Sequence, residues 1–176
     1  MPVTPAQARA LVKKRGVLLL VPDFVEAVAG EKVKGSWWGH PKGGEIFRLA
    51  EDLEDSGDVL VAKLVQGKTT FVHRALWPSV LALVQGADFR AKRLKKLSPA
   101  AKKLLAQVEQ ASVRGGTDPK AVKELEASLL VHVLAEHTES GRHEKRLTSW
   151  DDWAKARKVK AAKDASALHG LHKTSP

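Results

Sequence analysis

Apolar residues recur at helical spacing in three early segments, each bounded by capping residues. The first helix starts at Thr4-Pro5-Ala6-Gln7, which combines a capping box with proline at the first helical position, and Gly16 is placed to end it. After residues 17–21, which are either a short buried extended piece or more helix, Pro22 opens a short second helix. The third has an apolar face of Ile46, Phe47, Leu49, Ala50 and Leu53.

Two strand-like runs follow at 59–65 and 68–74, and Gln66-Gly67 connects them. A two-residue connection ending in glycine is typical of a β-hairpin, because glycine readily takes a positive φ. In the second run apolar and polar residues alternate, which leaves one face for the core and one for solvent. The first half of the chain is therefore predicted as three helices followed by a hairpin.

The second half is predicted to be helical. We expect helices over 78–84, 88–97 and 98–112, a longer helix from Pro119 to about residue 136, and a last one capped by the stretch Thr148-Ser149-Trp150-Asp151. The predicted fold is mainly α with one β-hairpin. It has a winged helix-turn-helix domain at 1–86, a helical extension with a basic helix at 87–155, and a flexible basic tail at 156–176.

Composition narrows the class of protein. The 176 residues are 43% hydrophobic, which is enough for a folded core, and they contain no cysteine, so disulfides and thiolate sites are excluded. Apolar runs such as 17–21 are too short to span a bilayer, and the N-terminus lacks the layout of a signal peptide. We therefore expect a cytoplasmic protein without a membrane partner.

The formal charge of +10 is concentrated in one segment. Residues 89–114 hold eight basic residues and one acidic residue, a net charge of +7. A run of cations without a carboxylate suits a phosphate backbone, although a solvated helix face would have the same composition. The cations of this run are Arg90, Lys92, Arg93, Lys95, Lys96, Lys102 and Lys103.

Particular residues between 24 and 83 point to a family. They are Gly35-Ser36-Trp37-Trp38, the third predicted helix, residues 57–61, Gly67-Lys68 and Arg74-Ala75-Leu76-Trp77. Through these residues, about a third of the chain resembles a winged-helix module of the bacterial interstrand-crosslink DNA glycosylases of the AlkZ/YcaQ type. That family has a paired tryptophan, then a helix, then a hairpin that ends in an arginine followed by an aromatic residue and a short apolar helix.

The resemblance implies binding of DNA, preferably double-stranded, through a recognition helix and a wing. The first turn of the third helix would place Lys42 and Arg48 against DNA. On the wing the candidates are Lys63, Lys68 and Arg74. Trp37 and Trp38 could stack on bases, while for one of the two we favour a place in the core.

The resemblance does not extend to catalysis. Those glycosylases use a Gln-x-Asp or Gln-x-Gln motif, and none of the glutamines of this chain stands in that pattern. No phosphate loop, dinucleotide-binding glycine motif or nucleophile elbow is present either. We therefore predict a protein that is not an enzyme and needs no cofactor.

One cluster keeps a hydrolase or nuclease hypothesis open. His137, Glu139, His143 and Glu144 could bind a divalent metal or act as an acid–base pair. Their spacing matches no zinc or nuclease motif, so a turn that ends a helix, broken at Gly141 with Arg142 paired to a glutamate, needs fewer assumptions. We predict no metal here.

The sequence therefore predicts a non-catalytic, nucleoid-associated DNA-binding protein linked to DNA repair or transcription. An alternative from another class is a protein-interaction adaptor that docks or self-associates through its C-terminal helices. The adaptor would need an exposed apolar stripe on the helix predicted from Pro119.

Overall fold

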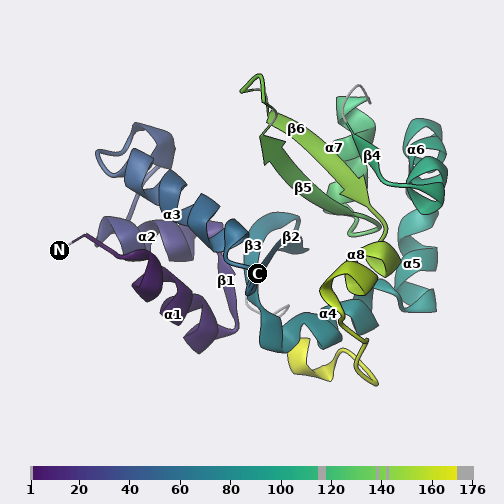
Figure 1. Cartoon of the computed structure of the whole chain (residues 1–176), viewed down its shortest axis with the longest axis horizontal. Helices are drawn as coiled ribbons and strands as arrows, with labels where there is room; N and C mark the ends of the chain where they lie inside the picture. The colour runs from purple at the N-terminus through teal and green to yellow at the C-terminus, as the bar shows by residue number, and fades with distance from the viewer. Residues whose placement is uncertain (1, 115–117, 138, 142, 170–176) are drawn as a thin grey trace. The chain divides into compact units, whose positions relative to one another are not determined.

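The computed structural model describes residues 2–114, 118–137, 139–141 and 143–169 (Figure 1). The chain forms two compact units, the first reaching Trp77 and the second covering Pro78–His169. The division therefore comes after Trp77, ahead of the boundary at 86 that the sequence suggested. Each unit has its own three-stranded sheet, and in both sheets all strand pairs are antiparallel.

The first unit has the predicted order of three helices and a hairpin, together with one additional paired strand. Strand β1 pairs with β3, which also pairs with β2, so the sheet order is β1-β3-β2. Val72 is the centre of this sheet, facing Val17 on one side and Leu60 on the other. The elements are α1 (Pro5–Arg15), β1 (Val17–Leu19), α2 (Val25–Ala29), α3 (Gly43–Asp55), β2 (Val59–Val65) and β3 (Lys68–His73).

Local chemistry explains the ends of these elements. The Thr4 hydroxyl accepts the Gln7 amide N–H at 3.2 Å and the Gln7 side chain accepts the Thr4 N–H at 2.9 Å, which completes the predicted capping box. Gly16 ends α1 with a φ of 75°. In the hairpin Gln66 and Gly67 both have positive φ, 50° and 68°, as a tight two-residue connection requires.

The core of the first unit lies between its helices and one face of its sheet (Figure 1). Phe24 and Phe71 meet edge to face there, with 5.1 Å between their ring centroids. The other fully or largely buried members are Ala8, Val12, Leu18, Val25, Val28, Ile46, Leu49, Leu53 and Val59.

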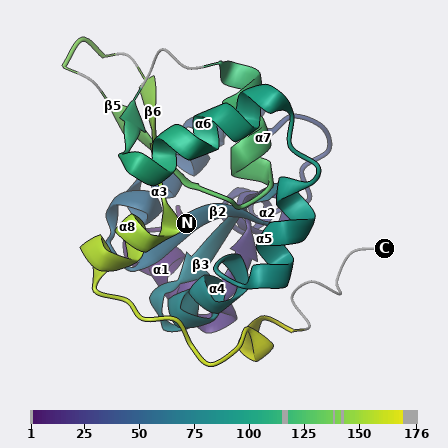
Figure 2. The same cartoon turned by 90° about the vertical axis from the view of Figure 1, so that its right-hand side faces the viewer.

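The second unit contains more strand than the sequence suggested. Figure 2 shows α6 and α7, whose apolar faces form a core with Leu147 of β6. Its sheet has the order β4-β6-β5. The prediction that the chain has one β-hairpin, followed by an extension made only of helices, is therefore wrong. The elements are α4 (Trp77–Val84), α5 (Ala87–Leu94), α6 (Pro99–Gln110), β4 (Val113–Arg114), α7 (Pro119–Ala127), β5 (His132–His137), β6 (His143–Thr148) and α8 (Trp150–Arg157).

The helix from Pro119 ends nine residues earlier than predicted, at Ala127. Leu129 takes a left-handed φ of 57° there, and its N–H bonds the Glu126 carbonyl at 3.2 Å while the next N–H reaches the Leu125 carbonyl at 3.4 Å. These two bonds form a Schellman motif. The left-handed conformation of a leucine costs roughly 1–2 kcal/mol. Its buried side chain and the Trp150 indole N–H, which donates to the Leu129 carbonyl at 2.8 Å, offset that cost.

The end of the chain is also more ordered than expected. Residues 158–169 include a short 3-10 turn, Ser166–Leu168, and the Leu168 side chain is fully buried. The tail predicted from 156 therefore includes local structure at 166–168, and residues 170–176 lie outside the described part. No helix in the described ranges has the length and apolar character needed to cross a membrane.

Candidate nucleic-acid interface

The first turn of α3 is built against the chain's own backbone. Trp37–Gly39 forms a single 3-10 turn whose carbonyls face Gly43. A Cβ on Gly43 would lie 3.0 Å from the carbonyl oxygens of both Trp37 and Trp38, so only glycine fits without a shift. The paired-tryptophan turn therefore packs directly against the start of α3.

Lys42, just before α3, has a structural partner. Its ammonium donates to the carbonyl oxygens of Val28 and Ala29, both at 3.1 Å. These are terminal carbonyls of α2, where a cation is favoured by the helix dipole. Lys42 thus ties α2 to the start of α3. Arg48, one turn further along α3, is exposed and forms no ion pair with any described residue.

The two tryptophans have separate environments. Their rings are stacked, with centroids 4.1 Å apart and planes inclined by 23°. Trp37 is half-buried and packs against the core of the first unit, whereas Trp38 is 64% exposed. Trp38 also touches Phe47 of α3, at 5.6 Å between centroids. The expectation that one member of the pair belongs to the core is confirmed.

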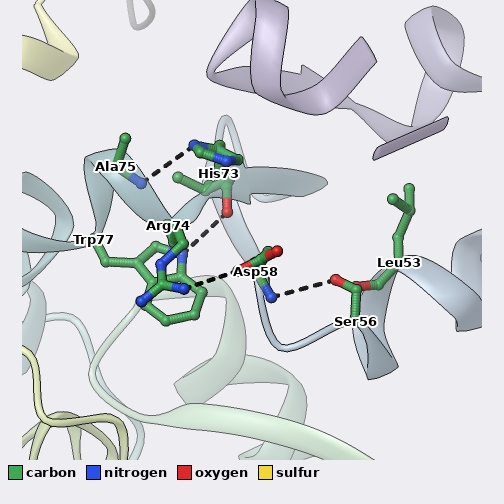
Figure 3. Close-up of polar contacts among 8 residues, drawn as sticks. Leu53, Ser56, Asp58, His73, Arg74, Ala75 and Trp77 are labelled. Carbon is green, nitrogen blue, oxygen red and sulfur yellow. Dashed lines mark hydrogen bonds and ion pairs between the residues drawn. The ribbon is translucent and has the colours of Figure 1, made fainter. Parts of the chain in front are cut away.

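The hairpin cations are partly engaged in local contacts. The Lys63 ammonium donates to the Thr69 hydroxyl across the hairpin at 2.7 Å, while Lys68 is exposed at the start of β3. Arg74 forms an ion pair with Asp58 at 3.1 Å, and its backbone N–H donates to the Asp58 carbonyl at 2.8 Å (Figure 3). Both side chains of that pair are largely exposed, so it contributes little stability and can open to another anion.

The basic segment 90–103 spans two helices, α5 and α6, joined by a turn before Pro99. Its two arginines are engaged within the second unit. Arg90 forms an ion pair with Glu109 at 2.9 Å. The Arg93 guanidinium lies 3.5 Å from the centroid of the Phe89 ring, and partial burial lowers its pKa.

The five lysines of this segment are all exposed and have no ionic partner among the described residues. Three of them follow one another at helical spacing over the end of α5 and the turn after it. The other two come directly after the buried Ala101 in the first turns of α6, on its outward side. We call these residues the lysine surface: Lys92, Lys95, Lys96, Lys102 and Lys103.

A contact that the sequence did not indicate fixes the start of α6. Glu124 of α7 accepts the Ser98 N–H at 2.6 Å and the Ser98 hydroxyl at 2.7 Å. These two hydrogen bonds lower the pKa of the Glu124 carboxyl. Ser98 was identified as a helix cap from sequence, but a partner 26 residues away leaves no local signal.

The cluster considered for a metal or acid–base role lies on the β5–β6 hairpin. In the register of the hairpin, His137 is opposite His143 and Glu136 is opposite Glu144. The interpretation as a helix-ending turn is therefore wrong, because strands lead into and out of it. Glu139 is exposed, and Arg142 falls outside the described residues. Within the described ranges no three His, Asp or Glu side chains are grouped so that they could hold a metal ion.

Sequence comparison adds a family to this geometry. Neither the curated proteins nor the solved structures contain a match to the chain. A family model described as AlkZ related matches residues 3–128, which takes in the whole first unit up to Trp77 and the second unit through α7. The match extends well beyond the third of the chain that carries the resemblance in the sequence. Since it covers more than half of the 176 residues, the chain belongs to the AlkZ-related family and is thereby related to DNA-repair proteins.

Proposed function

We propose that the protein binds double-stranded DNA without catalysing a reaction, and that the lysine surface supplies most of the electrostatic affinity. The observation that carries this proposal is the set of five exposed lysines without ionic partners in the described structure. Each phosphate that a lysine neutralises releases condensed counterions, which favours binding at low salt. Membership of the AlkZ-related family favours DNA over other polyanions.

The first unit would act as a winged helix. Its order of helix, strand, two helices and hairpin, with the first strand beside the third, supports this proposal because winged helices share that order. In this proposal α3 is the recognition helix and the β2–β3 connection is the wing. Exposed Arg48 and Lys68 would contact phosphates there. Because residues 1–77 hold 11 basic and 9 acidic residues, a net charge of only +2, this unit would position DNA more than attract it.

The adaptor alternative lacks its expected surface. The apolar positions of α7, Ala121, Val122 and Leu125, are buried in the core of their own unit. They are therefore not available as a stripe for a partner helix. If the protein is instead an adaptor that docks through another surface, replacing the lysine surface should not change its affinity for DNA.

The lysine surface can be tested by salt titration of binding to a fluorescent duplex. Replacing all five lysines with alanine should remove about five phosphate contacts and make the slope of log K against log[salt] less negative by about 4.5. A matched variant removes five exposed lysines from other segments: Lys13, Lys14, Lys155, Lys160 and Lys163.

The comparison of the two variants decides the proposal, since both lose the same net charge. Affinity at low salt should fall at least a hundredfold for the lysine-surface variant and much less for the matched one. Equal losses in both would mean that only the net charge matters. An unmodified protein that binds no duplex at low salt would disprove DNA binding.

A further inference from the structure

Trp38 is an exposed aromatic ring on a rigid support. It is one of two large hydrophobic residues in the described structure that are strongly exposed, the other being Val21 at 45%. Trp37 covers one face of its indole, and Phe47 of α3 approaches it at a tilt of 43°. Since 64% of the residue is nevertheless exposed, the accessible area belongs mainly to the other face and the edge of the ring.

The support fixes Trp38 before any ligand arrives. Trp37 packs on the core, and Gly43 holds the carbonyls of both tryptophans against the start of α3. A side chain that is already ordered loses little conformational entropy when it binds, so its contacts favour affinity more than those of a mobile side chain. An exposed indole held in this way is suited to stacking.

Exposed cations precede and follow the tryptophan pair in the sequence. Lys32 and Lys34 precede the tryptophan pair and are exposed, and Arg48 follows Phe47 on α3. The nearby Glu31 is engaged with His40 at 3.2 Å. An exposed aromatic face on a segment that also carries exposed cations complements a base with a phosphate on either side. An uncharged apolar partner would form no favourable electrostatic contact with these cations.

We infer that Trp38 stacks on an unpaired base, so that the preferred ligand is DNA containing a nucleotide outside the double-helical stack. The inference rests on the proposed DNA binding and specifies its ligand. Bases inside a duplex are covered on both faces by their neighbours, so a free indole face can stack only on a base that has left the stack or lies at a single-stranded position. Both sources present the same chemistry, a nucleobase face beside phosphates.

The test uses 2-aminopurine, a base whose fluorescence is quenched when it stacks on an aromatic ring. Three DNA ligands of one sequence are compared: a plain duplex, a duplex with one unpaired 2-aminopurine, and the single strand carrying it. The full chain should quench the unpaired probe and bind that duplex about tenfold more tightly than the plain one. Comparison with the single strand shows which source of unpaired base is preferred.

The variants are Trp38→Ala, Trp38→Phe and, as a matched loss of exposed apolar surface, Val21→Ala. Trp38→Ala should abolish both the quenching and the tenfold preference, so that the plain and the unpaired duplex bind equally. Trp38→Phe should retain part of both, and Val21→Ala should retain all. Thermal unfolding confirms that each variant is folded, as expected for substitutions of exposed side chains.

The outcomes separate this inference from the proposed function. If Trp38→Ala quenches the probe like the unmodified protein, or if the unmodified protein binds all three ligands equally, stacking is disproved while DNA binding stands. If Trp38→Ala weakens plain and unpaired duplexes by the same factor, Trp38 is a general contact and the inference is wrong. If no ligand is bound by the unmodified protein, the proposed function fails as well.

Discussion

At the scale of single residues, His132 shows how burial sets protonation. It is 7% exposed and packs against both Trp150 and Trp153, with ring centroids 5.5 and 5.9 Å away. Desolvation, and to a lesser extent the charge of Arg157, lowers its pKa to about 4. The imidazole therefore stays neutral in the folded protein at pH values where an unfolded histidine takes up a proton.

This residue should make the protein less stable as the pH falls from about 6.5 to about 4. In that window the unfolded chain binds a proton that the folded chain does not, so the free energy of unfolding decreases with decreasing pH by up to about 3 kcal/mol. Urea unfolding of the unmodified protein and of His132→Phe at pH 7.5 and pH 5 measures the effect. The variant should lose this part of the pH dependence, and a constant difference between the two proteins at both pH values would contradict the prediction.

At the scale of elements, the accuracy of the sequence-based prediction depends on where the stop signals lie. In the first unit three boundaries have a local signal: the Thr4 capping box starts α1, Gly16 ends it, and Gly67 turns the hairpin. The helix from Pro119 has none, because the left-handed residue that ends it is Leu129, stabilised by burial and by the distant Trp150. Its apolar run continues into β5, so helix and strand could not be distinguished there from sequence.

In the candidate interface, too, features with a local sequence signal were predicted and contacts between distant segments were not. The sequence was sufficient to predict the exposed lysines of 92–103, because charged side chains are usually exposed. It also predicted that one tryptophan of the pair would pack against the core. It could not show that the Lys42 ammonium would bind the last carbonyls of α2, or that Arg90 would pair with Glu109. Those contacts join segments that are distant in the sequence and are brought together only by the packing of each unit.

The bond between α6 and α7 allows a prediction for an element. Glu124 accepts two hydrogen bonds from Ser98, which itself caps α6 by accepting the Ala101 N–H. Glu124→Ala should lower the melting temperature, because it leaves the first turn of α6 without that anchor. Glu124→Gln keeps an acceptor oxygen and should lower it less.

The charge state of Glu124 supplies the control. Its lowered pKa means that it contributes stability above the pKa of an unfolded glutamic acid, and that this contribution is lost as the pH falls through the folded value. The difference in melting temperature between the unmodified protein and Glu124→Ala should therefore shrink in acid. A difference that persists unchanged at pH 3 would show that the carboxylate is not the source.

At the scale of the whole molecule, the division of charge separates attraction from positioning. The net charge of +7 over 89–114 belongs to the second unit, whereas residues 1–57 of the first unit are neutral overall. Affinity that depends on salt should therefore come mainly from the second unit, and discrimination between ligands from the first. The two contributions can be measured separately in the full chain.

Arg48→Ala combined with Lys68→Ala removes one exposed cation from the proposed recognition helix and one from the wing. Because at most two phosphate contacts are lost, the salt slope should become less negative by no more than about 2, against about 4.5 for the lysine-surface variant. The preference of the double variant for an unpaired base should remain, since Trp38, Trp37 and their support are unchanged. Salt titrations with the plain and the unpaired duplex measure both quantities. A slope change as large as that of the lysine-surface variant would place the main phosphate contacts on the first unit and reverse the assignment of roles.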